Sequence, residues 1–238
     1  MGEPVLRDHL PTDLKARMKA SYDAIADTYN TEFYKVNDPL RIDYLGRLVT
    51  LLRSSSSPSP VANVLELGCG AGVPATKFLL ESSDPKFRIT GNDISTSQLD
   101  LARTNLAGYV QDGRLTLQEG DMLSLSFPPS SFDAITGFYS IIHLPREEQS
   151  TLMGKIVEWL KPGGYFLANF SVRDMPGLEA EKWLGHEEGW MFWSGWGEEG
   201  SVRMVEGSGL EVLVREARQA VDDTTFVWVL ARKEGRGN

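Results

Sequence analysis

The sequence VANVLELGCGAG occupies residues 61–72 and joins an apolar run to a glycine-rich turn. The run from Val61 to Leu67 predicts a buried strand, and the residues from about Gly72 to Glu81 predict a helix. In an open parallel sheet, ligands bind where such a turn lies, at the carboxyl ends of the strands. Glycines also remove the Cβ atoms that would keep a ligand away from the backbone. The stretch therefore predicts an α/β fold with a ligand-binding turn built on Gly68, Gly70 and Gly72.

Strand-like and helix-like segments alternate after this turn. Short apolar segments predict further strands at 87–92, 114–118 and 132–139, and one that follows a turn at 161–164 and runs through Phe170. Helical patterns cover 96–107 and 146–160. Strands that are separated by helices imply right-handed crossovers, so we expect a mainly parallel sheet.

The two ends of the chain follow other patterns. Before the serine-rich loop at 54–60, helices are predicted from Thr12 to Asn30 and from about Asn37. After the fifth strand we expect an irregular segment at 174–197 and a short helix near 202–208. The final segments, 210–218 and 225–232, are joined by only a few residues. They predict a hairpin that places one antiparallel strand in the sheet.

The chain is acidic overall. Its 238 residues include 24 Lys and Arg against 33 Asp and Glu, which gives a formal net charge of −9. A surface of this sign repels phosphate backbones, so we expect no nucleic-acid partner. No apolar run approaches the roughly 20 residues that cross a bilayer, and the single Cys69 cannot form an intramolecular disulfide. The three His and one Cys offer no metal-ligand spacing. We expect a cytoplasmic protein without a metal, as a monomer or homodimer.

Acidic residues stand at the ends of three successive predicted strands: Glu66, Asp93 and Asp121. A dinucleotide would bring its pyrophosphate to the glycine turn, where Glu66 would repel it. The third glycine of the dinucleotide pattern is also replaced, by Val73. S-adenosylmethionine carries a ribose but no phosphate, and its amino and sulfonium groups are cationic. Acidic residues would attract such a ligand.

With these motifs, the run from Val64 to about Phe170 resembles a class I S-adenosylmethionine-dependent methyltransferase, and the terminal hairpin resembles that family's antiparallel pair. The resemblance implies a Rossmann-like sheet of seven strands, mostly parallel with the last strand antiparallel, and an N-terminal helical cap. We expect a single domain over 1–238. Its parts are a helical cap (1–53), a cofactor-binding core (61–172), a substrate-side insertion (173–200), and a C-terminal helix with the hairpin (201–238).

The resemblance also implies cofactor contacts at matching positions. The loop from Glu66 through Gly68 and Gly70 to Gly72 would hold the methionine moiety, and Asp93 the ribose hydroxyls. Ile94 would cover one adenine face, Asp121 with Met122 would meet the adenine amino group, and Phe138 would lie near the sulfonium. Tyr22 and Tyr29 resemble a helical lid over the methionine end. Ordinary packing is the alternative for Ile94 and Met122, and a core stripe for the two tyrosines.

His143 is the candidate catalytic residue. It follows the fourth strand of the sheet, on the side where the transferred methyl should point. A hydroxyl acceptor must lose its proton, and a group that titrates near neutral pH could accept it. The alternative is that His143 only forms a hydrogen bond in its loop.

A cluster of aromatic residues predicts the acceptor site. Four of the six tryptophans lie within 14 residues, and flat aromatic walls suit a hydrophobic small molecule. The alternative is that this segment builds a small core of its own. The predicted acceptor-binding residues are Tyr139, Trp183, Trp190, Phe192, Trp193 and Trp196.

The fourth strand ends in Gly137-Phe138-Tyr139, which differs from the Asn-Pro-Pro-Tyr-like box of relatives that modify adenine. We therefore expect methylation of a small aromatic or polyketide-like molecule of secondary metabolism, at oxygen. Methylation at nitrogen or sulfur, a non-methylating cyclisation on the same fold, and a protein that only senses the cofactor stay open.

Overall fold

The computed structural model describes residues 4–6, 11–34, 38–55, 59–220 and 224–235. Its main sheet has seven strands in the order β4-β3-β2-β5-β6-β10-β9. The last strand of the chain, β10, runs antiparallel to both of its neighbours, and the other pairings are parallel. The predicted seven-stranded fold is confirmed. The bounds are β2 (Val61–Leu67), β3 (Lys86–Asp93), β4 (Leu115–Glu119), β5 (Phe132–Gly137), β6 (Leu160–Ser171), β9 (Leu210–Gln219) and β10 (Thr225–Lys233).

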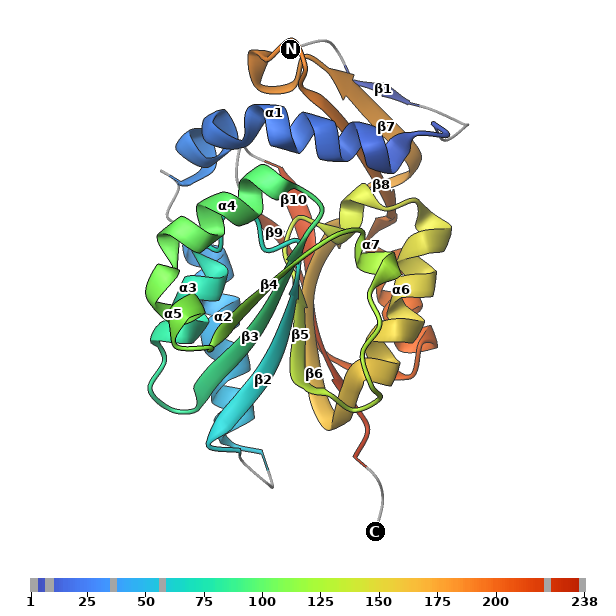
Figure 1. The fold of residues 1–238 in the computed structure, drawn as a ribbon. Coiled ribbons are helices and arrows are strands. Elements are labelled where there is room, and N and C mark those ends of the chain that lie inside the picture. Colours follow the sequence, from blue (N-terminus) through green and yellow to red (C-terminus); the bar gives the residue numbers. More distant parts are fainter. Residues whose placement is uncertain (1–3, 7–10, 35–37, 56–58, 221–223, 236–238) are drawn as a thin grey trace.

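Helices cover both faces of this sheet (Figure 1). On one face lie α2 (Pro39–Arg53), α3 (Ala75–Glu81), α4 (Thr96–Asn105) and α5 (Ala107–Gln111), and on the other α6 (Arg146–Trp159) and α7 (Gly197–Gly207). The central strands are covered on both faces, which explains why they consist of continuous apolar runs. Val64, Leu65 and Leu67 of β2 are each fully buried.

The two N-terminal helices take different positions. The helix α1 (Leu14–Tyr34) crosses the carboxyl edge of the sheet, whereas α2 packs against a sheet face (Figure 1). Of these two helices, therefore, α1 is the one that covers the edge at which the predicted site residues lie. The division of the chain into four parts stays a prediction.

The segment at 174–197, predicted to be irregular, is instead a second sheet. The strands β7 (Asp174–Glu181) and β8 (Trp190–Trp196) pair antiparallel, and the short β1 (Val5–Leu6) adds to β7. The strand β8 was missed because most of its side chains are buried, so polar and apolar residues do not alternate along it. Together with α1, this sheet lies over the carboxyl edge of the main sheet (Figure 1).

Several helix boundaries also differ from the prediction; α1 ends at Tyr34 rather than Asn30, and α4 ends at Asn105, before a separate α5. The helix α3 begins at Ala75 rather than Gly72, because Gly72 has a φ of +75°, which a right-handed helix does not allow. The helix α7 begins at Gly197 rather than near Val202. None of the described helices combines the length and the apolarity that a membrane span requires.

The glycine turn after β2 approaches the loop after β5 closely. Gly68 has a φ of +71°, and a Cβ built on it would lie 2.3 Å from Cβ of Ser140. Gly113 has a similar φ of +75°, but a Cβ there would meet nothing within 4 Å. A side chain at Gly113 would therefore cause backbone strain alone, whereas a side chain at Gly68 would cause the same strain and also collide with Ser140.

We expect Gly113→Ala to lower the free energy of unfolding by about 1 to 2 kcal/mol, the cost of a left-handed alanine. Gly68→Ala should lose about 1 to 3 kcal/mol more, because the Ser140 loop must move. Urea denaturation of both variants measures this difference. Equal losses would mean that the turn and the loop do not pack as described.

Candidate active site

A cavity lies at the carboxyl ends of β2 to β5, beneath α1; we call it the first cavity. It is bounded by residues of α1, the glycine turn, the ends of β3 and β4, the helix α4 and the loop after β5. Most of the residues that the sequence predicted for the site line it. They are Tyr22, Tyr29, Gly68, Gly70, Asp93, Ile94, Asp121, Met122, Phe138, Tyr139 and His143.

Asp93 is a buried carboxylate held by backbone donors. The backbone N–H of Gly70 donates to Oδ2 at 2.8 Å, and that of Ser95 donates to Oδ1 at 2.9 Å. Burial raises the pKa of Asp93, although these hydrogen bonds oppose the rise. Each oxygen keeps a further lone pair, so the side chain can accept hydrogen bonds from a ligand in the cavity.

Asp121 lies where the first cavity meets the carboxyl end of β4. Its Oδ1 accepts from the backbone N–H of Leu123 at 3.0 Å, and Nζ of Lys15 on α1 is 3.4 Å from the same oxygen. Lys15 also pairs with Glu148 on α6, at 2.6 Å. The start of α1 is thus tied electrostatically to this end of the cavity.

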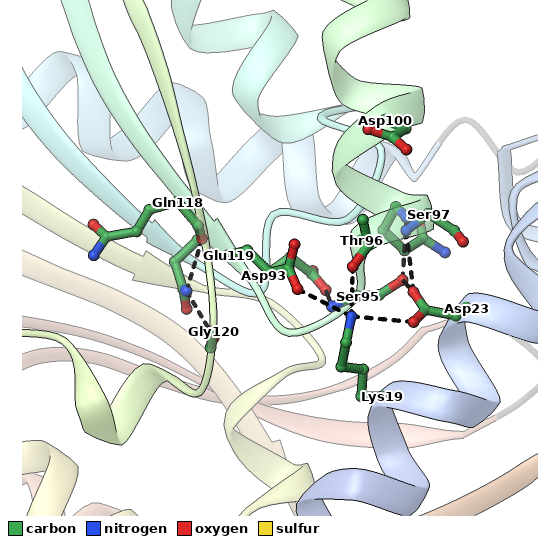
Figure 2. A network of polar contacts seen from close by, with 12 residues as sticks. Lys19, Asp23, Asp93, Ser95, Thr96, Ser97, Asp100, Gln118, Glu119 and Gly120 are labelled. Atoms are coloured by element: carbon green, nitrogen blue, oxygen red, sulfur yellow. Dashed lines mark hydrogen bonds and ion pairs between the residues drawn. The ribbon is translucent and has the colours of Figure 1, made fainter.

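A second set of polar contacts fastens the middle of α1 to the sheet edge (Figure 2). Nζ of Lys19 lies 3.1 Å from both Asp23 and Glu119 and also donates to Thr96 Oγ1. Asp23 accepts from Ser95 Oγ at 2.7 Å. Ser95 therefore links α1 to Asp93, since its N–H binds the carboxylate of Asp93 and its hydroxyl binds that of Asp23.

Asp23 also caps the helix α4. Its Oδ1 accepts from the backbone N–H of Ser97 at 3.0 Å. Burial raises the pKa of Asp23, but hydrogen bonds from Ser95, Ser97 and Lys19 outweigh it, and the net shift is downward. Asp23 is therefore ionised at neutral pH and holds α1 against the first turn of α4.

His143 has a fixed tautomer. Nδ1 lies 2.7 Å from the carbonyl oxygen of Phe192, which can only accept, so Nδ1 carries the proton. Nε2 then accepts from the hydroxyl of Tyr22 at 2.9 Å. Burial lowers the pKa of His143 to about 4, although its backbone hydrogen bonds oppose this. The imidazole is neutral at pH 7, with its lone pair directed to Tyr22.

A second cavity adjoins the first and lies between α1, the loop after β5 and the smaller sheet. Both cavities are lined by Tyr22, Tyr29, Tyr139 and His143. Of the other predicted acceptor residues, Trp183 and Trp193 line the second cavity. The hydroxyl of Tyr139 donates to the buried Asp38 at 3.0 Å, which fixes this ring at the boundary between the cavities.

Three predicted acceptor residues lie elsewhere. Trp190 and Phe192 are buried in a hydrophobic cluster with α1, and Arg17 of α1 stacks over the Trp190 ring at 4.2 Å. Successive side chains of a strand face opposite sides, so Trp193 can line the cavity while its neighbour Phe192 does not. Trp196 packs beneath the guanidinium of Arg146 at 4.9 Å. Trp190 and Phe192 therefore pack in a core that this segment shares with α1.

Two predicted cofactor residues also lie outside the first cavity. Glu66 is buried within β2 and accepts from the hydroxyl of Thr76 on α3. A Cβ on Gly72 would meet the Leu106 side chain at 2.6 Å, so this glycine serves close packing beneath the turn. Both residues shape the loop without lining the space that it encloses.

Two buried amides that the sequence analysis missed line the first cavity. Asn92 donates from Nδ2 to the carbonyl oxygens of Gln118 and Gly120, and its Oδ1 has no partner among the described residues. Gln98 accepts at Oε1 from Asn30, and its Nε2 has no partner there either. A buried polar atom without a partner is costly, so these two atoms point to a polar ligand.

The position of Asn92 next to Asp93 at a strand end could have identified it. Gln98 has no such signal, because only the fold turns this helical side chain toward the cavity. Among the residues that the structure describes, no group of three His, Cys, Asp or Glu side chains could hold a metal ion.

Comparison with known proteins agrees with this geometry. Residues 64–164 match the family model described as a methyltransferase domain. The chain is 36% identical over 103 residues to sterol 24-C-methyltransferase erg-4 of Neurospora crassa, which covers 43% of the chain and 26% of the relative. It is 30% identical over 106 residues to an O-methyltransferase of Pyrenophora dematioidea, which covers 44% of the chain and 38% of the relative. These matches therefore span well under half the length of each relative.

The fold extends further than the sequence similarity. A solved structure of 1,6-didemethyltoxoflavin-N1-methyltransferase of Burkholderia thailandensis superposes with a TM-score of 0.71, covering 97% of this chain and 94% of that one. The identity is 16%, so this likeness concerns the fold. The family match over residues 64–164 and the shared fold support the resemblance to class I S-adenosylmethionine-dependent methyltransferases.

We expect the stability of the ligand-free protein to depend on Glu66. Burial raises its pKa from 4.5 to about 7. Between these values the unfolded chain releases a proton that the folded state keeps, so the free energy of unfolding falls as pH rises, by about 3 kcal/mol in total. The Glu66→Gln variant has no such proton to release. Its free energy of unfolding, measured by urea denaturation, should therefore rise relative to that of the wild type between pH 4.5 and 8. Glu81 is exposed, so the free energy of unfolding of Glu81→Gln should depend on pH as that of the wild type does. The same pH dependence in Glu66→Gln and the wild type would contradict the raised pKa of Glu66.

Proposed function

We propose that this chain, whose residues 64–164 match a methyltransferase domain, is a class I S-adenosylmethionine-dependent enzyme that transfers a methyl group to a small-molecule acceptor. One observation carries the proposal. The cavity that is lined by Asp93 and by the two amides with one unpartnered atom each meets a second, aromatic cavity at His143 and three tyrosines. A two-substrate reaction requires two adjoining sites of this kind.

The residues of the first cavity fit S-adenosylmethionine. Asp93 would accept the ribose hydroxyls, and the buried atoms Asn92 Oδ1 and Gln98 Nε2, which have no partner among the described residues, would supply an acceptor and a donor. Asp121 would accept from the adenine amino group, between Ile94 and Met122. Gly68 and Gly70 would lie against the methionine moiety, with Phe138, Tyr22 and Tyr29 near the sulfonium. When bound, this cofactor supplies an electrophilic methyl group.

The helix α1 would keep water away from the reaction. Tyr22 and Tyr29 pack edge to face, with ring centroids 5.6 Å apart, and Trp183 lies 5.8 Å from Tyr29. These rings close the space between the two cavities from the side of α1. Displacement at a saturated carbon needs an aligned nucleophile in a site without competing water, and this helix serves both needs.

We infer that the acceptor lies in the second cavity against Trp183 and Trp193, with its reacting atom near His143. At neutral pH the imidazole is unprotonated and can take the proton of a hydroxyl acceptor at Nε2. Tyr22 now occupies that lone pair, so the acceptor must displace its hydroxyl or pass the proton through it. Oxygen is the proposed target atom. The alternatives that the methyl-transfer assay described below distinguishes are methylation at nitrogen, methylation at sulfur and a cyclisation without methylation.

The first test concerns the cofactor site. Asp93→Ala should weaken the binding of S-adenosylhomocysteine at least tenfold, because charge-assisted hydrogen bonds are lost. Isothermal titration calorimetry measures the affinity. The exposed Asp100→Ala on α4 removes a carboxylate that lines neither cavity and should bind as the wild type does. NADH binding to the wild type in competition with S-adenosylhomocysteine would overturn the cofactor assignment.

The second test concerns the base. Methyl-labelled S-adenosylmethionine is incubated with matched phenols, anilines and thiophenols, and mass spectrometry locates the label. With a phenol, His143→Gln should lower turnover about 100-fold while the affinity for S-adenosylhomocysteine stays within a few-fold. The turnover of the wild type should show no protonation of a catalytic base between pH 6 and 8, because burial lowers the pKa of His143 to about 4. Full activity of His143→Gln would remove His143 from the chemistry.

A further inference from the structure

The second cavity contains two arginines beside its apolar wall. Ile142, Leu184, Trp183 and Trp193 contribute apolar and aromatic surface, whereas Arg41 and Arg173 bring positive charge. Asp38 is the only acidic residue among the described residues that line this cavity. The formal charge of these lining residues is therefore positive, although the chain as a whole carries −9.

The charge of Arg41 is compensated. Its Nε donates to Oδ2 of the buried Asp38 at 3.1 Å, and the backbone N–H of Arg41 donates to Oδ1 of the same carboxylate at 3.0 Å. The guanidinium also lies over the Tyr139 ring, 4.8 Å from its centroid. Arg41 thus belongs to a closed pair that orders the boundary between the two cavities.

Arg173 differs, because only its backbone is fixed. It lies in the two-residue link between β6 and β7. Its N–H donates to Ser171 Oγ at 3.0 Å, and its carbonyl oxygen accepts from the N–H of Gly197 at 3.2 Å. The side chain is exposed and makes no ion pair or hydrogen bond with any residue that the structure describes. A positive charge at the mouth of an aromatic cavity is therefore left for a ligand.

We propose that Arg173 selects an acceptor that carries an acidic group, such as a carboxylate, on an aromatic or apolar body. This inference rests on the proposed function, because it names the acceptor class for the second cavity. The body would lie against Trp183 and Trp193, and the acidic group would bind the guanidinium, whose planar fork matches a carboxylate. The acidic chain offers an anion no general attraction, so recognition depends on this local charge.

A pair of fluorescent probes separates charge from apolar contact. 8-Anilinonaphthalene-1-sulfonate has an aromatic body with one anionic group, and N-phenyl-1-naphthylamine has the same body without it. The two probes should compete with each other for binding to the wild-type chain of residues 1–238. Arg173→Met should weaken sulfonate binding about tenfold and leave the neutral probe unchanged, and Arg173→Lys should lose less than Arg173→Met. Salt should weaken sulfonate binding in the wild type more than in Arg173→Met.

Arg88→Met is the matched control. Arg88 is exposed on β3, outside both cavities, and its replacement changes the net charge by the same amount. It should bind both probes as the wild type does. Equal sulfonate binding by Arg173→Met and the wild type, equal losses in both methionine variants, or a parallel loss of the neutral probe would each overturn the proposal.

The difference in binding between the anionic and the neutral probe does not depend on methyl transfer. It can therefore be observed even if the proposed methyltransferase function is wrong. Conversely, the binding of S-adenosylhomocysteine tests the first cavity alone. If the chain methylates acceptors, Arg173→Met should lower the preference for a hydroxybenzoate over its methyl ester about tenfold. Most of that change should lie in KM, because Arg173 holds the acceptor away from the reacting atom. An unchanged preference would contradict the inference.

Discussion

The buried carboxylate of Asp93 is the constraint on which the carboxyl edge of the sheet depends. A carboxylate is costly to remove from water, so it requires donors. Here the donors are backbone N–H groups of Gly70 in the glycine turn and of Ser95 at the start of α4. The glycine turn must therefore bend toward β3, and α4 must begin directly after β3. The shape of the first cavity follows from satisfying one side chain.

The same group also couples the lid helix to the sheet. Ser95 binds Asp93 through its N–H and Asp23 of α1 through its hydroxyl, and Lys19 extends the contact to β4. A helix that covers the first cavity is thus joined to the residue that would hold the cofactor's ribose. Because Tyr22 of this helix also binds His143, the position of α1 affects both cavities.

The sequence alone predicted the features that follow from local pattern and topology. Apolar runs and helical periods identified the sheet, and strand ends placed Asp93 and Asp121 at one edge, since parallel strands end together. The second sheet escaped prediction, because β8 is buried without alternation and β7 contains Pro176 and Gly177. Gln98, Arg173 and the separation of Trp193 from Trp190 depend on contacts between distant segments. No local pattern carries that information.

Burial acts on the acids and on the base of this site in opposite directions, and both shifts favour neutral side chains. It raises the pKa of Glu66 and of Asp93 and lowers that of His143. A cationic ligand in the first cavity would favour the ionised carboxyl groups and oppose protonation of His143. Replacing it by a neutral ligand would reverse both effects. The basicity of His143 is therefore coupled to the charge held beside Asp93, so the imidazole accepts a proton most readily once that charge has gone.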